Sequence, residues 1–357
     1  MNTNATKHCL VLGMGYTGCK VIASLAELPG YDELECIALD TDSLALAELP
    51  PNVQTMQLPY NDEPSKSISS HKEMICGKLK ECGVLICAAG LGGRTGAAVG
   101  QILEYADSLH IPALLLAVMP FAFEPEERQR RAESALMQME VYCRVVLLAP
   151  NDDISVQDNV ALHAAFVEHT KFLAMAAASL ATPFYQKRLF NITPSMYANL
   201  VRDASPRCQF LTVEASGSYP SATIVEAVKG NQIFKGCVCD RGLALLRVNG
   251  KCLKIELDNV CAMLQKEMRN VSLEFATCVD DALPVTMRLT LLLHTVEAQD
   301  FSNGGSMGHF EQSGQLFLEF PDDGRGIFAY DPPNMWNDEN VDIPTFIRRK
   351  VTIDKGT

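Results

Sequence analysis

Short apolar runs alternate with helical patterns over residues 8–150 of the chain. Five runs are continuously apolar, as parallel strands covered on both faces are, at 9–12, 36–39, 84–88, 113–118 and 145–148. Helical patterns lie between them, at about 18–28, 68–82, 95–109 and 125–141. This alternation predicts a doubly wound, mostly parallel α/β sheet with helices on both faces.

The rest of the chain predicts a long helix, a second α/β unit and a tail. Residues 159–181 are apolar nearly all round, which predicts a buried central helix. Strands are expected near 210–215, 243–248, 271–278 and 286–295, with helices near 221–230 and 256–268. Residues 299–340 are rich in Gly, Ser, Asn, Asp and Pro without any period, which predicts a flexible acidic linker. We therefore divide the chain into an N-terminal domain with the central helix (1–181), an inter-domain loop and helix (182–204), a smaller C-terminal α/β domain (205–298), the linker (299–340) and a terminal peptide (341–357).

Composition and charge narrow the class of protein. The formal net charge is -13 and the pI about 5.0, which argues against nucleic acid or anionic lipid as the main partner, because both need a basic face. The first residues are polar and no apolar run reaches the ~18 residues of a membrane span, so we expect a cytoplasmic protein without membrane insertion. The 13 cysteines include no C-x-x-C pair, which favours reduced thiols and no metal site.

The first glycine-rich loop, Gly13-Met14-Gly15-Tyr16-Thr17-Gly18, follows a predicted strand and opens a helix. Glycines let the backbone approach a phosphate closely, and the helix N-terminus offers free N–H groups and a positive dipole end. Asp40 ends the second predicted strand, where a dinucleotide enzyme binds its ribose. Taken alone, this loop favours an NAD-dependent oxidoreductase with a Rossmann domain.

A second glycine-rich loop spans Gly90-Leu91-Gly92-Gly93-Arg94-Thr95-Gly96 and also lies between a strand and a helix. A Rossmann domain does not need a second glycine run at this point. Because both loops follow neighbouring strands, they converge on one crevice, which suits the phosphates of a nucleoside triphosphate.

With these loops the chain resembles FtsZ, the bacterial tubulin relative of cell division. The second loop is similar to the family's GGGTG signature, and Ile37-Ala38-Leu39-Asp40-Thr41-Asp42 looks like its second-strand loop. Pro120-Phe121-Ala122-Phe123-Glu124 looks like its ribose loop, and Pro150-Asn151-Asp152 like the loop whose Asn reads guanine. Asp342-Ile343-Pro344-Thr345-Phe346-Ile347-Arg348-Arg349 looks like its adaptor-binding peptide, and it is the most specific match because a linker separates it from the rest.

The resemblance implies an FtsZ/tubulin-type fold that binds GTP or GDP, with Mg²⁺ alongside the phosphates. It implies head-to-tail self-assembly into filaments and a membrane-associated adaptor that binds Ile343, Phe346, Ile347 and Arg348. The expected nucleotide-binding residues are Gly13, Gly15, Gly18, Asp40, Gly90, Gly92, Gly93, Thr95, Gly96, Glu124, Arg128 and Asn151.

The phosphate loops depart from the family at three points. The family's glycine-rich loop after the third strand is replaced by 58–65 (LPYNDEPS), which has no glycine and adds acid. Arg94 replaces a glycine; it either adds a cation to the phosphates or points to solvent. Lys20 replaces an Asn; it either reaches a phosphate or is a solvated helix lysine.

Hydrolysis and base recognition depart as well. The family's N-x-D-x-x-D loop, whose carboxylates position the attacking water, reads Asn191 to Met196 here, with Thr193 and Met196 in place of the two acids. We therefore expect GTP hydrolysis to be weak or absent and assign no catalytic residue. The residue of the central helix that faces the base is either Lys171, in a gapless alignment, or Glu168, with a small gap.

The leading interpretation is an FtsZ-like cytoskeletal GTP-binding protein. Two alternatives stay open: an FtsZ-like scaffold that has lost nucleotide turnover, and an NAD-dependent oxidoreductase supported only by the loop Gly13–Gly18 and Asp40.

Overall fold

The computed structural model describes residues 8–28, 31, 34–61, 63–151, 162–185, 196–197, 200, 206–231, 238–296, 335–336 and 339–340. The chain forms two compact units, Met1–Gln299 and Asp300–Thr357. The first unit contains one ten-stranded sheet with the strand order β3-β2-β1-β4-β5-β6-β7-β10-β8-β9.

Six parallel strands form the N-terminal part of this sheet. They are β1 (His8–Met14), β2 (Glu35–Asp40), β3 (Gln54–Gln57), β4 (Cys82–Gly90), β5 (Ala113–Met119) and β6 (Val145–Pro150). Five of them were predicted from their apolar runs. The sixth, β3, was missed because its four residues are mostly exposed and polar, as befits an edge strand paired only to β2.

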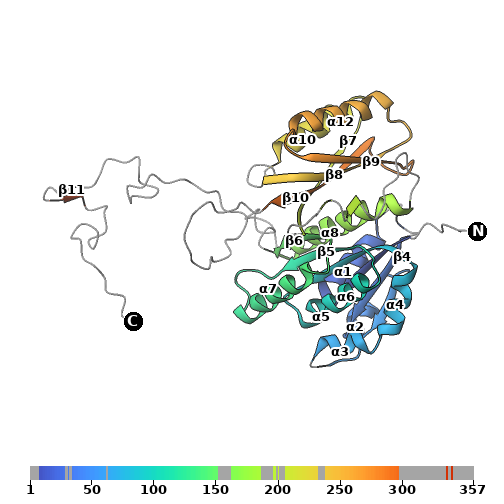
Figure 1. Ribbon diagram of the computed structural model, residues 1–357, viewed down its shortest axis with the longest axis vertical. Helices are drawn as coiled ribbons and strands as arrows, with labels where there is room; N and C mark the ends of the chain where they lie inside the picture. The colour runs from blue at the N-terminus through green and yellow to red at the C-terminus, as the bar shows by residue number, and fades with distance from the viewer. Residues whose placement is uncertain are drawn as a thin grey trace, which may run out of the picture. The chain divides into compact units, whose positions relative to one another are not determined.

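Helices cover both faces of these strands, as predicted (Figure 1). One face packs on α1 (Gly15–Ala26) and α8 (Leu162–Tyr185) through a cluster that contains Val11, Ile86 and Leu114. The other face packs on α3 (Pro64–Ser69), α4 (Lys72–Glu81), α6 (Val99–Ser108) and α7 (Glu126–Glu140). Side chains alternate between the faces, so Leu10, Leu12 and Leu85 belong to the second cluster. Two short helices, α2 (Ser43–Ala47) and α5 (Arg94–Ala97), follow β2 and β4.

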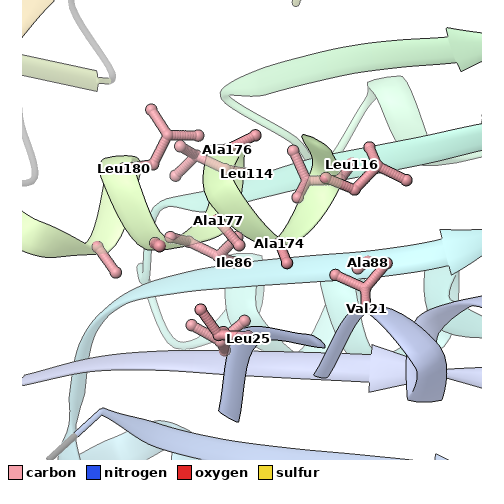
Figure 2. Packing of buried hydrophobic residues seen from close by; sticks show 14 of the residues in the cluster. Val21, Leu25, Ile86, Ala88, Leu114, Leu116, Ala174, Ala176, Ala177 and Leu180 are labelled. Carbon is pink, nitrogen blue, oxygen red and sulfur yellow. The ribbon is translucent and has the colours of Figure 1, made fainter. Parts of the chain in front are cut away.

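The long helix α8 is buried over only part of its length. Ala174, Ala177 and Leu180 lie against Ile86 and neighbouring strand residues, as Figure 2 shows. Alanines have no side chain beyond Cβ, so the helix can approach the sheet closely. Its first half is exposed, with Phe166 and Phe172 at 38% and 43% of their full exposure. The prediction of a helix buried throughout was therefore wrong for this half.

The C-terminal part of the sheet continues the N-terminal part without a break. It contains β7 (Arg207–Ala215), β8 (Val238–Val248), β9 (Ser272–Val279) and β10 (Met287–Val296), with α10 (Pro220–Gly230) and α12 (Lys254–Glu267) packed on a third cluster. β10 runs antiparallel to β7 and β8. β6 pairs with β7 through Val146–Arg207 and Leu147–Cys208. The predicted boundary at 182–204 therefore does not divide the sheet.

The second unit contains one described element, a short antiparallel pair of strands. β11 (Met335–Trp336) pairs with β12 (Glu339–Asn340) inside the range predicted as a linker. The predicted adaptor-binding residues Ile343, Phe346, Ile347 and Arg348 lie outside the described residues.

Candidate functional site

A cavity of about 330 Å³ lies at the carboxyl ends of the N-terminal strands. Strand order reverses between β1 and β4, and open α/β sheets bind ligands at this switch point. The volume of the cavity falls in the range of small-molecule sites. The cavity is lined by Met14, Gly15, Tyr16, Thr17, Asp40, Asp42, Ala45, Gly90, Gly92, Gly93, Arg94, Thr95, Gly96, Val118, Pro120, Glu124, Arg128 and Asn151.

The two glycine-rich loops contact each other in the lining of the cavity. Gly15 has a φ of 72°, a left-handed conformation that favours glycine, and a Cβ there would lie 2.9 Å from the backbone nitrogen of Gly96. The loops therefore converge as predicted, and their backbones lie too close for side chains at this contact.

Gly13 and Gly18, both predicted to bind the nucleotide, do not line the cavity. A Cβ at Gly18 would lie 2.3 Å from the carbonyl oxygen of Ala88 on β4, and one at Gly13 would lie 2.3 Å from the carbonyl oxygen of Gly18. These two glycines let α1 pack directly on the strands, so they position the loop from behind.

The second loop contains one glycine whose missing side chain serves no packing purpose. A Cβ at Gly96 would lie 2.2 Å from the carbonyl oxygen of Gly90, so Gly96 is required by the loop itself. At Gly93 the nearest protein atom would be 3.7 Å away, and its φ of -87° suits any residue. Gly93 lines the cavity, so its open side is available to a ligand.

Two carboxylates at the end of β2 and just after it also line the cavity. Asp40 is buried, and its Oδ1 accepts hydrogen bonds from the backbone nitrogens of Thr41 at 2.6 Å and Asp42 at 3.3 Å. Asp42 caps α2 by accepting from the backbone nitrogen of Leu44 at 2.9 Å. Asp42 was quoted in the predicted loop but was not predicted as a site residue; its place directly after the strand end was the available signal.

The predicted ribose loop is tied to the second glycine loop. Glu124 accepts a hydrogen bond from the backbone nitrogen of Phe121 at 2.9 Å and forms an ion pair with Arg128 at 2.6 Å. Arg128 and Arg131 donate to the carbonyl oxygen of Gly92 at 3.4 and 3.1 Å. The Glu124–Arg128 pair is partly exposed, so it contributes no more than about 1 kcal/mol to stability. The ion pair holds the Glu124 carboxylate and the Arg128 guanidinium at the cavity.

The three departures in the phosphate loops differ in where they lie relative to the cavity. Arg94 lines the cavity. Lys20 does not; its ammonium pairs with Glu48 at 3.2 Å and lies 5.4 Å from the ring centroid of Tyr16. None of the described residues of the loop, 58–61 and 63–65, lines the cavity. Within this loop Leu58 is buried and Tyr60 is exposed.

Neither candidate for the base-facing residue of α8 lines the cavity. Glu168 and Lys171 form an exposed ion pair with each other at 2.8 Å. Phe166 instead reaches the predicted ribose loop, where its ring lies edge-on to Phe121 at 5.3 Å, and Phe121 stacks on Phe123 at 4.7 Å. Burial lowers the pKa of His169, which favours a neutral imidazole on this helix.

The residues that replace the family's catalytic acids are only partly described. Met196 is half-buried and packs against the core cluster beneath α8. Asn191 and Thr193 lie outside the described residues. A thioether cannot accept or donate a proton near neutral pH, so Met196 offers packing and no acid–base chemistry.

The described residues offer neither a cluster of metal ligands nor a membrane-spanning helix. There, no group of three or more His, Cys, Asp or Glu side chains could hold a metal ion. None of the helices that the structure describes combines the length and the apolar character needed to cross a membrane.

The curated proteins to which the chain is similar include FtsZ proteins at low sequence identity. No protein-family model matches the chain. Cell division protein FtsZ of Helicobacter pylori strain J99 is 25% identical over 186 residues, covering 48% of each chain. FtsZ of Methanothermobacter thermautotrophicus is 21% identical over 310 residues, covering 83% of this chain and 81% of the relative. The chain thus spans about half the length of the first curated relatives that it matches.

Solved structures show the same fold. An empty FtsZ dimer from M. jannaschii superposes with a TM-score of 0.70 at 16% identity, over 82% of this chain and 89% of that one. CetZ2 from Haloferax volcanii, in a GTPγS-bound protofilament, gives a TM-score of 0.62 at 16% identity, over 82% and 94%. The ten-stranded, mostly parallel sheet with its helices is therefore an FtsZ/tubulin fold, as predicted.

Proposed function

We propose that this chain, a divergent FtsZ/tubulin-like protein by its relatives and its fold, binds a guanine nucleotide and assembles head to tail into filaments of bacterial cell division in the cytoplasm. One observation carries the proposal. Both glycine loops, the acidic loop after β2, Glu124 and Asn151 line a single cavity at the switch point of the sheet.

The cavity's chemistry suits a nucleotide. The backbone N–H groups of the two loops are donors for phosphate oxygens, and Arg94 and Arg128 add positive charge. Glu124 can accept from ribose hydroxyls while keeping its ion pair, because each carboxylate oxygen has two lone pairs. The Asn151 amide supplies both a donor and an acceptor for a base edge.

Mg²⁺ fits this site as a partner of the phosphates. Mg²⁺ prefers oxygen ligands and usually takes one or two carboxylates together with substrate phosphates. Asp40 and Asp42 line the cavity and are the residues that would hold it. When bound, the ion would neutralise the negative charge of the phosphates. Without it, the two carboxylates would repel the phosphates.

Assembly and turnover follow from the same family. The similar structures include an FtsZ dimer and a CetZ2 protofilament, which supports head-to-tail self-association here. Hydrolysis is weak or absent, because Thr193 and Met196 stand where relatives of the family place the water-positioning acids. The terminal peptide with Phe346 then attaches the filament to a membrane-associated adaptor.

An NAD-dependent oxidoreductase is the second candidate. The order β3-β2-β1-β4-β5-β6 is also that of a dinucleotide-binding domain, and Asp40 ends β2. However, this candidate assigns no role to the second glycine loop, which lines the same cavity. An FtsZ-like scaffold without nucleotide turnover shares the fold and the assembly, and it corresponds to the case in which GTP hydrolysis is absent.

The test begins with the nucleotide that purified protein releases on denaturation, identified by chromatography against GDP, GTP and NAD standards. Titration calorimetry with the same three ligands follows, and right-angle light scattering with GTP measures assembly. We expect GDP or GTP to bind, and scattering to rise above a critical protein concentration. Binding of NAD without binding of either guanine nucleotide would establish the oxidoreductase instead.

A further inference from the structure

A buried tyrosine that follows α1 is held between two arginines of the C-terminal strands. The Tyr31 hydroxyl accepts hydrogen bonds from Arg247 on β8 and, at 3.5 Å, from Arg288 on β10. The Arg247 guanidinium carbon also lies 4.8 Å from the Tyr31 ring centroid, a cation–π contact. We call Tyr31, Arg247 and Arg288 the tyrosine clamp.

Acidic partners neutralise both arginines of the clamp. Arg247 forms an ion pair with Asp280, and Arg288 pairs with Glu214 on β7 through Nε and Nη2, at 2.6 and 2.5 Å. Tyr31, Arg247, Arg288 and Asp280 are all more than nine-tenths buried. Buried charges of this kind tolerate little displacement, because a lost partner leaves an uncompensated charge. The clamp therefore favours one arrangement of Tyr31 relative to β8 and β10.

The same tyrosine belongs to the buried cluster that holds α1, and α1 begins at the glycine-loop cavity. α1 begins at Gly15, which lines the cavity, and ends at Ala26, shortly before Tyr31. A helix of 12 residues spans about 18 Å. Gly18 packs on the carbonyl of Ala88 without room for a side chain, and Val21 and Leu25 are fully buried. Close packing of this kind transmits a shift at one end of a helix to the other.

We infer that the tyrosine clamp couples the glycine-loop cavity to the C-terminal strands, so that a phosphate-bearing ligand in the cavity makes β8 and β10 more rigid. This inference rests on the proposed nucleotide site. A ligand that orders the first glycine loop orders α1, and α1 carries that order to Tyr31 and the arginines. Coupling between sites is reciprocal, so a substitution that removes the clamp should weaken ligand binding by up to the coupling factor.

Tyr31→Phe is the test variant, because it removes the hydroxyl that both arginines contact and keeps the ring. Tyr105→Phe is the control: Tyr105 is also buried, on α6, with its ring 5.0 Å from the Lys72 ammonium and outside the clamp. Both full-length variants and the wild type are titrated with GDP by calorimetry. Hydrogen–deuterium exchange of peptides from β8 and β10 is measured with and without GDP, and thermal unfolding records stability.

In the wild type we expect GDP to slow exchange in β8 and β10. Tyr31→Phe should abolish this protection and weaken GDP binding about tenfold, within the range typical of coupled sites. Tyr105→Phe should keep both the protection and the affinity. If the clamp only stabilises the fold, Tyr31→Phe should lower the unfolding temperature and leave both the GDP affinity and the protection by GDP unchanged. That result would overturn the proposed coupling.

The outcomes also separate this inference from the proposed function. Failure of the wild type to bind GDP or GTP would overturn both. Wild-type binding without any slowing of exchange in β8 and β10 would overturn the coupling and leave the nucleotide site standing.

Discussion

Substitution of Gly93 by valine should abolish nucleotide binding and leave the fold intact. The backbone at Gly93 has an ordinary φ of -87°, and a Cβ would meet its nearest protein atom only at 3.7 Å. A Cβ therefore fits without displacing any protein atom, on a residue that lines the cavity. A branched side chain at this position would keep a phosphate from the backbone N–H groups of the loop.

The expected magnitudes follow from these distances. Gly93 is the N-cap of α5, where valine is less favourable than glycine by up to about 1 kcal/mol, so the unfolding temperature of Gly93→Val should fall by no more than about 2 °C. Two lost charge-assisted hydrogen bonds, at about 1.5–3 kcal/mol each, correspond to at least 100-fold weaker binding. Gly96→Ala is the matched contrast, because its Cβ would lie 2.2 Å from a carbonyl oxygen, about 1 Å inside normal contact. That overlap should cost about 3 kcal/mol, or about 6 °C.

Calorimetry with GDP and thermal unfolding measure the two effects on the same protein samples. Gly77→Ala serves as the second control, since nothing lies within 4 Å of its Cβ position on α4. If Gly93→Val binds GDP as the wild type does, the second glycine loop does not hold phosphates. If Gly93→Val has a much lower unfolding temperature than the wild type, Gly93 is required for packing, and its open side does not serve a ligand.

Three further predictions concern the acids, a helix contact and the tail. Thr193→Asp combined with Met196→Asp should raise GTP hydrolysis by on the order of 10²-fold, measured by phosphate release, and an unchanged rate would mean that more than the acids is missing. Hydrogen bonds from the Ser221 hydroxyl and backbone hold the pKa of Glu256 below its ordinary value, so this contact stabilises the fold above the unfolded pKa and is lost as pH falls through the folded one. The unfolding temperatures of wild type and Ser221→Ala should therefore differ most near neutral pH and converge below about pH 4, whereas a gap that widens in acid would contradict this assignment. Phe346→Ala should cost about 2 kcal/mol or more of adaptor binding and delocalise a fluorescent fusion in cells, while calorimetry shows unchanged GDP affinity; normal localisation would exclude Phe346 as the anchor.

The N-terminal strands could be predicted because burial on both faces leaves continuous apolar runs. The run at 113–118 matches β5, Ala113–Met119, to within one residue. The edge strand β3 could not, because Gln54–Gln57 is exposed and its pairing with β2 requires no apolar side chain. The helix pattern of 68–82 likewise hid a break, since α3 ends at Ser69 and α4 begins at Lys72.

The candidate site was more predictable in its loops than in its individual residues. Glycine spacing located both loops, yet it could not distinguish Gly93, which is open to a ligand, from Gly96, which the loop itself requires. The composition of α8 indicated a helix but not which half the sheet would cover. The tyrosine clamp left no signal at all, because Tyr31 lies 216 residues from Arg247, and an arginine in a strand is usually a solvent-facing residue.

The short β11–β12 pair has a practical consequence for spectroscopy. The chain contains a single tryptophan, and β11 carries it as Trp336, a few residues before the predicted docking peptide. Tryptophan emission therefore reports on the Asp300–Thr357 unit, and the sheet of Met1–Gln299 adds no tryptophan background. The tail thus contains its own fluorophore, and adaptor binding can be followed by emission shift or anisotropy on the unlabelled wild-type protein.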